Sequence, residues 1–146
     1  MRVSKKFPIA VHALLIMAQF GGTDKTTSAH IAQSTGANAV VIRNIFGELK
    51  NSGLIEATAG KKGGARLAKK AADISLWDVY RAVETDSVDE IFKFHEGSNR
   101  CPVGKNIYQL MHPHMNDALR AMREELAQVS LETLQNELAV ALDNEK

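Results

Sequence analysis

Two neighbouring polar side chains, Arg43 and Asn44, lie in a segment whose apolar residues repeat with helical spacing. A guanidinium and a carboxamide are the groups that most often hydrogen-bond the edges of guanine and adenine in the major groove. Between residues 38 and 53 the apolar positions fall at i, i+3, i+4 and i+7, which predicts a helix with one buried stripe. The stripe consists of Ile42, Ile45, Phe46 and Leu49. This pattern is typical of a helix that lies in a groove of duplex DNA.

The second group with distinctive chemistry is the thiol of Cys101, the only cysteine in the chain. Cys101 follows Arg100 and precedes Pro102, and because proline is favoured at the first helical position, we expect the thiol at a helix N-terminus. A cation and a helix N-terminus both stabilise a thiolate, the form that reacts with oxidants and electrophiles. These features predict a thiol sensor at Cys101. An inert, half-buried cysteine is the alternative.

A single cysteine excludes several other kinds of site. It cannot close a disulfide within the chain, and it cannot by itself hold zinc or an iron-sulfur cluster, so we expect no cofactor. Metal binding by Cys101 with three nearby histidines is a further alternative, although a His-x-His pair on a helix points its rings in different directions. These histidines are His95, His112 and His114. An enzyme using Cys101 would need an oriented base, and His95 has no evident third partner. We therefore predict no catalytic residue and no metal site.

The residues before Arg43 predict a second helix and a tight turn. Thr27 is suited to cap a short helix over residues 28–35, and Gly36 is suited to the turn that follows. Asn38 is suited to cap the next helix. Two short helices joined by a turn that contains glycine make a helix-turn-helix, in which the second helix enters the major groove.

A pair of short strands is predicted directly after the helix-turn-helix. Residues 54–58 and 65–68 have strand-like composition and flank a turn with two adjacent glycines. Such a hairpin, or wing, can lie along the adjacent phosphates or the minor groove, and Lys61, Lys62 and Arg66 are suited to bind there. An ordinary surface hairpin with lysines for solubility is the alternative.

These elements together give a set of predicted DNA-contacting residues. We expect Arg43 and Asn44 to contact base edges, because they are exposed on the second helix. We expect Asn38 and the two wing lysines to contact phosphates, which fix the position of the protein on the duplex. The full set is Thr27, Ser28, Asn38, Val40, Arg43, Asn44, Lys61, Lys62 and Arg66.

The two halves of the chain carry opposite charge. Residues 1–70 contain eleven Lys and Arg against three acids, a net charge of +8, and residues 71–146 contain seven against fourteen, a net charge of −7. A basic half that contains a helix-turn-helix indicates a nucleic-acid end and a second end with another role. An unevenly charged but merely solvated surface is the alternative.

The remaining segments predict supporting and assembling helices. A supporting helix should run from Lys5 or Pro8 to Phe20, and Ser75 with Asp78 should cap a helix whose buried stripe is Leu76, Val79, Tyr80 and Val83. A long helix should follow Cys101 to about Gln128, kinked at Pro113 or starting there, and a final helix should follow Ser130. The long apolar stripe needs a partner, so we expect a homodimer, with folding back onto the same chain as the alternative. The predicted dimerisation residues are Met115, Leu119, Met122 and Leu126.

The wing and the following helix resemble a known family. The run GLIEATAGKKGGARLAKKAADISLWDVYRAVE, residues 53–84, resembles the signature of the bacterial Rrf family of winged-helix regulators of the IscR, NsrR and CymR type. The segment HEGSNRCPVGKNI is most similar to the YwnA branch. The resemblance covers nearly the whole chain and implies a winged helix with a long dimerisation helix, in a dimeric transcription regulator.

The sequence also departs from this family in two ways. Relatives that bind an iron-sulfur cluster carry three cysteines before the dimerisation helix, whereas here only Cys101 is present, which argues against a cluster. Many relatives have Arg before the wing glycines and Tyr after them, where this chain has Ala59 and Ala65. Wing contacts would therefore depend on the lysines and Arg66.

The predicted fold is mainly α with a small β wing: a winged helix-turn-helix domain plus a long C-terminal dimerisation helix. We expect a DNA-binding domain at 1–84, a linker or sensor loop at 85–104, and dimerisation helices at 105–146. The expected partners are a palindromic double-stranded DNA operator and a second copy of the chain. Because no apolar run reaches eighteen residues, we expect no membrane segment and a cytoplasmic protein. Repression of transcription is the expected function; the alternatives are a winged-helix protein responding to a small-molecule or metal ligand, and a protein-protein interaction module without DNA binding.

Overall fold

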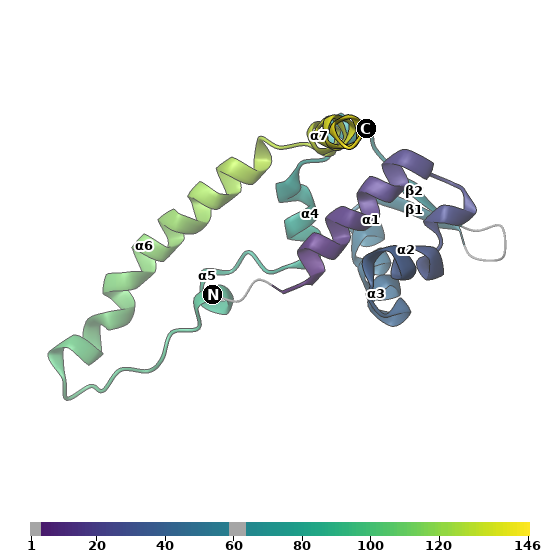
Figure 1. Ribbon diagram of the computed structural model, residues 1–146. Helices are drawn as coiled ribbons and strands as arrows, with labels where there is room; N and C mark the ends of the chain where they lie inside the picture. Colours follow the sequence, from purple (N-terminus) through teal and green to yellow (C-terminus); the bar gives the residue numbers. More distant parts are fainter. Residues whose placement is uncertain (1–3, 59–63) are drawn as a thin grey trace.

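The computed structural model describes residues 4–58 and 64–146, and it is mainly helical with one two-stranded sheet (Figure 1). Of the residues predicted to contact DNA, Lys61 and Lys62 lie outside the described residues. The fold class predicted from the sequence is confirmed. In chain order the elements are α1 (Lys6–Phe20), the 3-10 helix η1 (Asp24–Thr26), α2 (Ser28–Thr35), α3 (Ala39–Asn51), β1 (Ile55–Thr58), β2 (Gly64–Leu67), the 3-10 helix η2 (Ala71–Asp73), α4 (Leu76–Val83), α5 (Val88–Phe92), α6 (Pro102–Ala127) and α7 (Leu131–Asn144).

The hydrophobic core lies between α1, α2, α3, the sheet and α4. Leu14 of α1 is fully buried, as are Ile31 of α2 and Ile42 of α3. The predicted stripe of α3 is confirmed, since Ile42, Ile45 and Leu49 are buried and Phe46 packs against them from a half-buried position. Burial of such aliphatic side chains contributes roughly 1.5–3 kcal/mol each to folding. This core fixes α3 with its polar residues outward.

The turn between α2 and α3 follows the local chemistry of its residues. The Thr27 hydroxyl accepts a hydrogen bond from the backbone N–H of His30 at 3.2 Å, which caps α2. Gly36 ends α2 with a φ of +73°, a left-handed conformation that glycine adopts without strain. The side-chain amide oxygen of Asn38 accepts a hydrogen bond from the N–H of Val40 at 2.7 Å and caps α3. The helix-turn-helix predicted from these residues is therefore confirmed.

The wing is an antiparallel pair in which Glu56 lies opposite Arg66. Gly64 brings the start of β2 directly against the turn that precedes α2. A Cβ atom at Gly64 would lie 2.6 Å from the carbonyl oxygen of Thr23 and 2.6 Å from the hydroxyl of Thr26, closer than real Cβ contacts. Glycine at this position therefore allows the wing to pack closely beside the helix-turn-helix.

Helix α4 begins with the predicted capping box, in which Ser75 and Asp78 exchange hydrogen bonds between their side chains and backbone N–H groups. The predicted buried stripe of α4 was wrong in one residue. Trp77 is 5 % exposed and stacks on Tyr80 with ring centroids 5.2 Å apart, whereas Leu76 is half-buried. Arg123 of α6 lies over the Trp77 ring, 5.9 Å from its centroid, so α6 covers this face of α4.

Helix α6 forms an arm that extends away from the winged domain (Figure 1). None of its described residues is buried. The helix runs from Pro102 to Ala127 through Pro113, so the alternative that it begins at Pro113 is wrong. Before it, residues 88–92 form the short helix α5, which the sequence did not predict. Helix α7 returns to the winged domain, because Leu131 is fully buried in the core and its N–H donates to the carbonyl of Ile74 at 2.9 Å.

Candidate nucleic-acid interface

One face of α3 is directed away from the core and carries the residues predicted to contact bases. Val40 is 52 % exposed, and Arg43 and Asn44 are also exposed. They lie opposite the buried stripe of the same helix. The capping side chain of Asn38, also exposed, stands at the beginning of this face. The structure thus brings four of the predicted residues onto one accessible surface.

The start of α2 lies next to this surface in the chain. Thr27 and Ser28 are half-buried, and the Thr27 hydroxyl both accepts a bond from His30 and donates one to the carbonyl of Asp24 at 3.1 Å. The first N–H groups of a helix have no partner within it and are a common site for phosphate contacts. A contact from Thr27 and Ser28 to DNA stays a prediction.

Arg66, predicted to bind phosphate from the wing, has a partner within the sheet. Its guanidinium lies 2.8 Å from the carboxylate of Glu56 on the opposite strand. Both side chains are largely exposed, so solvent screens the pair and little energy is needed to exchange Glu56 for a phosphate. A DNA contact from Arg66 therefore requires that it leave, or share, this carboxylate.

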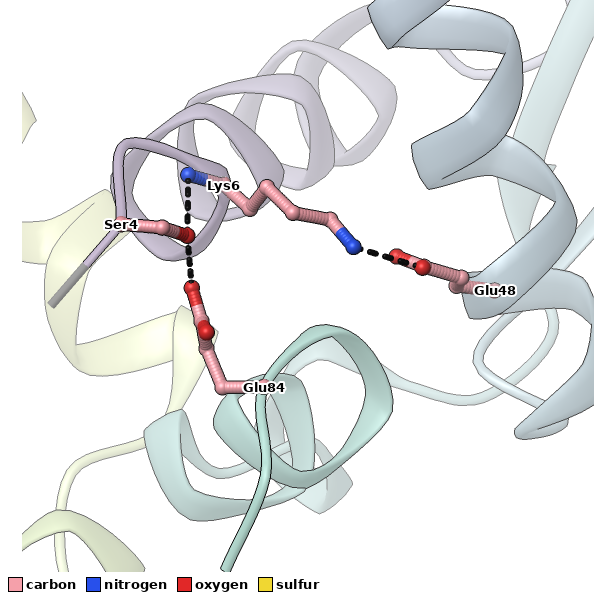
Figure 2. A network of polar contacts seen from close by, with 4 residues as sticks. All are labelled: Ser4, Lys6, Glu48 and Glu84. Atoms are coloured by element: carbon pink, nitrogen blue, oxygen red, sulfur yellow. Dashed lines mark hydrogen bonds and ion pairs between the residues drawn. The ribbon is translucent and has the colours of Figure 1, made fainter. Parts of the chain in front are cut away.

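Polar contacts at the beginning of α1 join three helices (Figure 2). The ammonium of Lys6 lies 2.6 Å from a carboxylate oxygen of Glu48 in α3. The Ser4 hydroxyl accepts a hydrogen bond from the N–H of Lys6 at 3.2 Å and donates one to Glu84 at the end of α4. These contacts were not predicted from the sequence, because nothing in the local pattern connects Lys6 with a residue 42 positions away.

Cys101 is exposed and occupies the N-cap position of α6, with Pro102 as the first residue of the helix. This confirms the predicted placement of the thiol. The backbone N–H of Cys101 donates to the carbonyl of Ser98 at 3.2 Å, which turns the chain into the helix.

The loop before Cys101 is held on α6 by an aromatic cluster. The rings of Phe94 and Tyr108 meet edge to face with centroids 5.0 Å apart, and Tyr108 and His112 are also 5.0 Å apart. The Tyr108 hydroxyl donates to Asp89 of α5 at 2.8 Å. This bond to a carboxylate raises the pKa of Tyr108 above that of an unperturbed tyrosine, because the bond requires the protonated phenol.

An open cavity of about 580 Å³ lies between this loop and the first turns of α6. Its wall includes the aromatic rings of Phe94 and Tyr108 and the charged side chains of Lys93, Glu96 and Lys105. His95 also lines the cavity.

Within the described ranges, 4–58 and 64–146, no group of three or more His, Cys, Asp or Glu residues is arranged to hold a metal ion. The alternative metal site with Cys101, His95, His112 and His114 thus has no support from the geometry.

Comparison with known proteins identifies the family. The model of the Rrf2 family, described as "Iron-dependent Transcriptional regulator", matches residues 3–137. The chain belongs to this family. It is 38 % identical over 137 residues to the HTH-type transcriptional regulator YwnA of Bacillus subtilis, covering 93 % of this chain and 98 % of that one. It is 31 % identical over 106 residues to the regulator IscR of Vibrio atlanticus, covering 69 % and 60 % of the two chains.

Solved structures show the same fold. The crystal structure of a transcriptional regulator from Lactobacillus plantarum aligns with a TM-score of 0.80 at 29 % identity, covering 97 % of this chain and 96 % of that one. A structure described as a DNA binding protein aligns with a TM-score of 0.69 at 34 % identity, covering 88 % and 97 %. These matches confirm the resemblance found in the sequence and the function class, transcription regulation by a DNA-binding family. The relatives are regulators, and no enzymatic family is indicated.

The family description names iron, and the residues of this chain do not fit an iron-sulfur cluster. Such clusters are held mainly by cysteine thiolates, and Cys101 is the only cysteine. Its thiol is exposed at the N-cap of α6, and the described side chains around it do not form a metal-ligating group.

Among the described residues, no helix is long and apolar enough to cross a membrane.

Proposed function

We propose that this protein is a homodimeric repressor of transcription that recognises a palindromic DNA site through α3. The observation that carries the proposal is the accessible face of α3, where Arg43 and Asn44 are exposed opposite the stripe that packs on the core. Arginine is suited to guanine and asparagine to adenine in the major groove. The basic wing would contact the adjacent phosphates, through Lys61, Lys62 and Arg66. We place this activity in the cytoplasm, where a bacterial regulator meets DNA.

The unburied arm supports the dimer. Helix α6 has 26 residues, which corresponds to a length of about 39 Å, and its stripe of Met115, Leu119, Met122 and Leu126 is only half-buried in one chain. Helix α1 has a second apolar face that, with Leu138 of α7, lines an open groove of about 440 Å³. Since an apolar face of a helix is normally buried, both features indicate a partner surface. A second copy would supply it and place two α3 helices on successive half-sites.

Cys101 is the proposed switch of this repressor. Its exposed thiol stands where the loop from the winged domain meets the arm. The sulfur would form a bond to a ring carbon of an electrophile such as a quinone, and a quinone oxygen would take up the thiol proton. The added group would change how the loop packs against the start of the helix. Because both half-sites must be engaged together, a small displacement of each α3 can lower affinity strongly without loss of any contact residue.

A small molecule is a second candidate signal, favoured by the cavity beside α6. The cavity lies within the predicted linker and at the first turns of the arm, so a ligand there would act on the same junction. The test is to measure DNA release by candidate ligands with the Cys101→Ser variant, which lacks the thiol. A protein-protein interaction module with this fold would not show the salt-dependent binding to duplex DNA that is expected of a DNA-binding protein.

The proposed readout is tested by selection from a random duplex pool. The wild-type protein should enrich duplexes that share two inverted half-sites with centres about one helical turn apart, or a multiple of it. We call the enriched sequence the selected duplex and its base-shuffled version the scrambled duplex. Footprinting should then show protection on both half-sites. Failure to enrich any sequence would contradict the proposed function.

A further inference from the structure

The first turn of α1 is joined to α3 by the ion pair between Lys6 and Glu48 (Figure 2). Figure 2 shows the Lys6 side chain reaching across from α1 to Glu48 on α3. The same turn holds α4, because Ser4 bonds Glu84 and the Phe7 ring meets Tyr80 edge to face at 5.5 Å. The ion pair therefore belongs to a turn that is itself anchored.

Glu48 lies close to the residues predicted to read bases. It follows Asn44 by four residues, which places it on the same side of α3 one turn further on, about 6 Å along the axis. A carboxylate so near the readout face would repel DNA phosphates if its charge were not compensated. Pairing with Lys6 compensates the charge and directs the carboxylate towards α1.

The ion pair is partly buried, so its two side chains have less freedom to move than those of an ordinary surface ion pair. The side chains of Lys6 and Glu48 are only 37 % and 36 % exposed. The second carboxylate oxygen of Glu48 is inaccessible to solvent and has no hydrogen-bond partner within residues 4–58 and 64–146. In that part of the chain, the Lys6 ammonium is the one cation that forms an ion pair with Glu48. Removing Lys6 would leave a partly desolvated carboxylate without compensation, which is unfavourable.

From this geometry we propose that Lys6 is a positioning residue for sequence readout: its ion pair with Glu48 adds to the core packing that orients α3 and keeps a carboxylate away from the DNA. This inference rests on the proposed function of α3. Within the described part of the chain, Lys6 forms no hydrogen bond or ion pair with a residue predicted to contact DNA, and it acts through Glu48. Loss of the pair lets Glu48 turn towards solvent and lets α3 shift, so the hydrogen bonds of Arg43 and Asn44 to bases lose their geometry, whereas contacts to phosphates tolerate the shift.

Lys5 provides a matched control. It is the adjacent residue, it is exposed, and it forms no ion pair with a described residue. Lys5→Met and Lys6→Met remove the same charge from the same turn. Any difference between them in DNA binding therefore reports the ion pair and not the net charge.

The experiment measures dissociation constants for the selected and the scrambled duplex with full-length variants whose folding is checked by circular dichroism. Lys6→Met should weaken binding to the selected duplex at least about threefold more than Lys5→Met, while both weaken binding to the scrambled duplex alike. Lys6→Arg, which keeps a cation in place, should retain the wild-type ratio of the two constants. In Lys6→Met with Glu48→Gln the unpaired carboxylate is gone, so part of the selected-duplex affinity should return.

Two results would overturn the inference while leaving the proposed function intact. The first is that the wild type enriches a sequence, but Lys5→Met and Lys6→Met weaken binding to that selected duplex by the same factor. The second is that Lys6→Arg loses as much discrimination between the selected and the scrambled duplex as Lys6→Met does. That result would indicate a merely structural need for lysine. A wild type that enriches no sequence would contradict the proposed function and this inference together.

Discussion

The hydroxyl of Tyr108, near the start of α6, donates a 2.8 Å hydrogen bond to the carboxylate of Asp89 in α5. His112, one turn further along α6, lies 3.9 Å from the same carboxylate. The bond joins the short helix before the loop to the arm after it. The two ends of the loop that carries Cys101 are thus held together by Asp89 on one side and by Tyr108 and His112 of α6 on the other.

This bond predicts the alkaline titration of the protein. The chain has two tyrosines, and both have a raised pKa: Tyr108 chiefly through its bond to Asp89, and Tyr80 chiefly through burial. A raised folded-state pKa means that stability is fully present below the pKa of an unfolded tyrosine and is lost as pH rises through the folded value. Asp89→Asn should lower the pKa of Tyr108 and leave that of Tyr80 unchanged, as followed by phenolate absorbance. Two unchanged titrations would show that Asp89 does not hold the phenol.

Two glycines should respond to alanine in opposite directions. Gly64→Ala places a Cβ 2.6 Å from backbone and side-chain atoms at the turn before α2, so it should destabilise the fold by about 1–3 kcal/mol. Gly47→Ala, within α3, meets nothing within 4 Å and should stabilise by about 0.5–1 kcal/mol, because alanine favours helix. Urea unfolding measures both. A destabilised Gly47→Ala protein would contradict the open space described at that position.

The proposed dimer predicts the effect of a charge on the arm. Leu119→Asp would place an unpaired carboxylate in the interface and should yield monomers with greatly weakened binding to the selected duplex. Asn116→Asp, at an exposed position of the same helix, adds the same charge and should remain dimeric. Sedimentation at micromolar concentration distinguishes the two. A monomeric wild type under these conditions would refute the dimer.

The proposed switch predicts that Cys101→Ser binds DNA like the wild type but no longer responds to thiol reagents. Wild-type protein treated with diamide or a quinone should release the selected duplex, because the modified thiol alters the junction of loop and arm. Reductant should restore binding after diamide. If Cys101→Ser still releases DNA after treatment, the signal acts elsewhere, and the cavity beside α6 becomes the site to test.

The sequence predicted the winged domain well because its signals are local. Thr27, Gly36 and Asn38 carry the chemistry of caps and turns within a few residues of the structure that they form, and the α3 stripe follows one helical period. The Cys101–Pro102 pair located the start of α6 for the same reason. Each of these predictions depends only on neighbours in the chain.

Features that depend on distant residues were not predicted. Trp77 is buried although it falls outside the expected stripe, because Arg123 of α6 covers it. The ion pair of Lys6 with Glu48 joins opposite charges that no sequence spacing relates. Helix α5 is only five residues long, too short for a periodic pattern to identify. The division at 84 and 104 stays a prediction, although α7 packs on α1 and η2 of the winged domain.

The central claim, that the exposed face of α3 reads sequence, is tested most directly by the affinity of Arg43→Ala for the selected and the scrambled duplex. Lys50→Ala is the matched control, because it removes the same charge from an exposed position at the other end of α3. Arg43→Ala should cost about 1–3 kcal/mol on the selected duplex and little on the scrambled one. Lys50→Ala should affect both duplexes equally. An Arg43→Ala protein that loses the same affinity for both would contradict base readout by this helix.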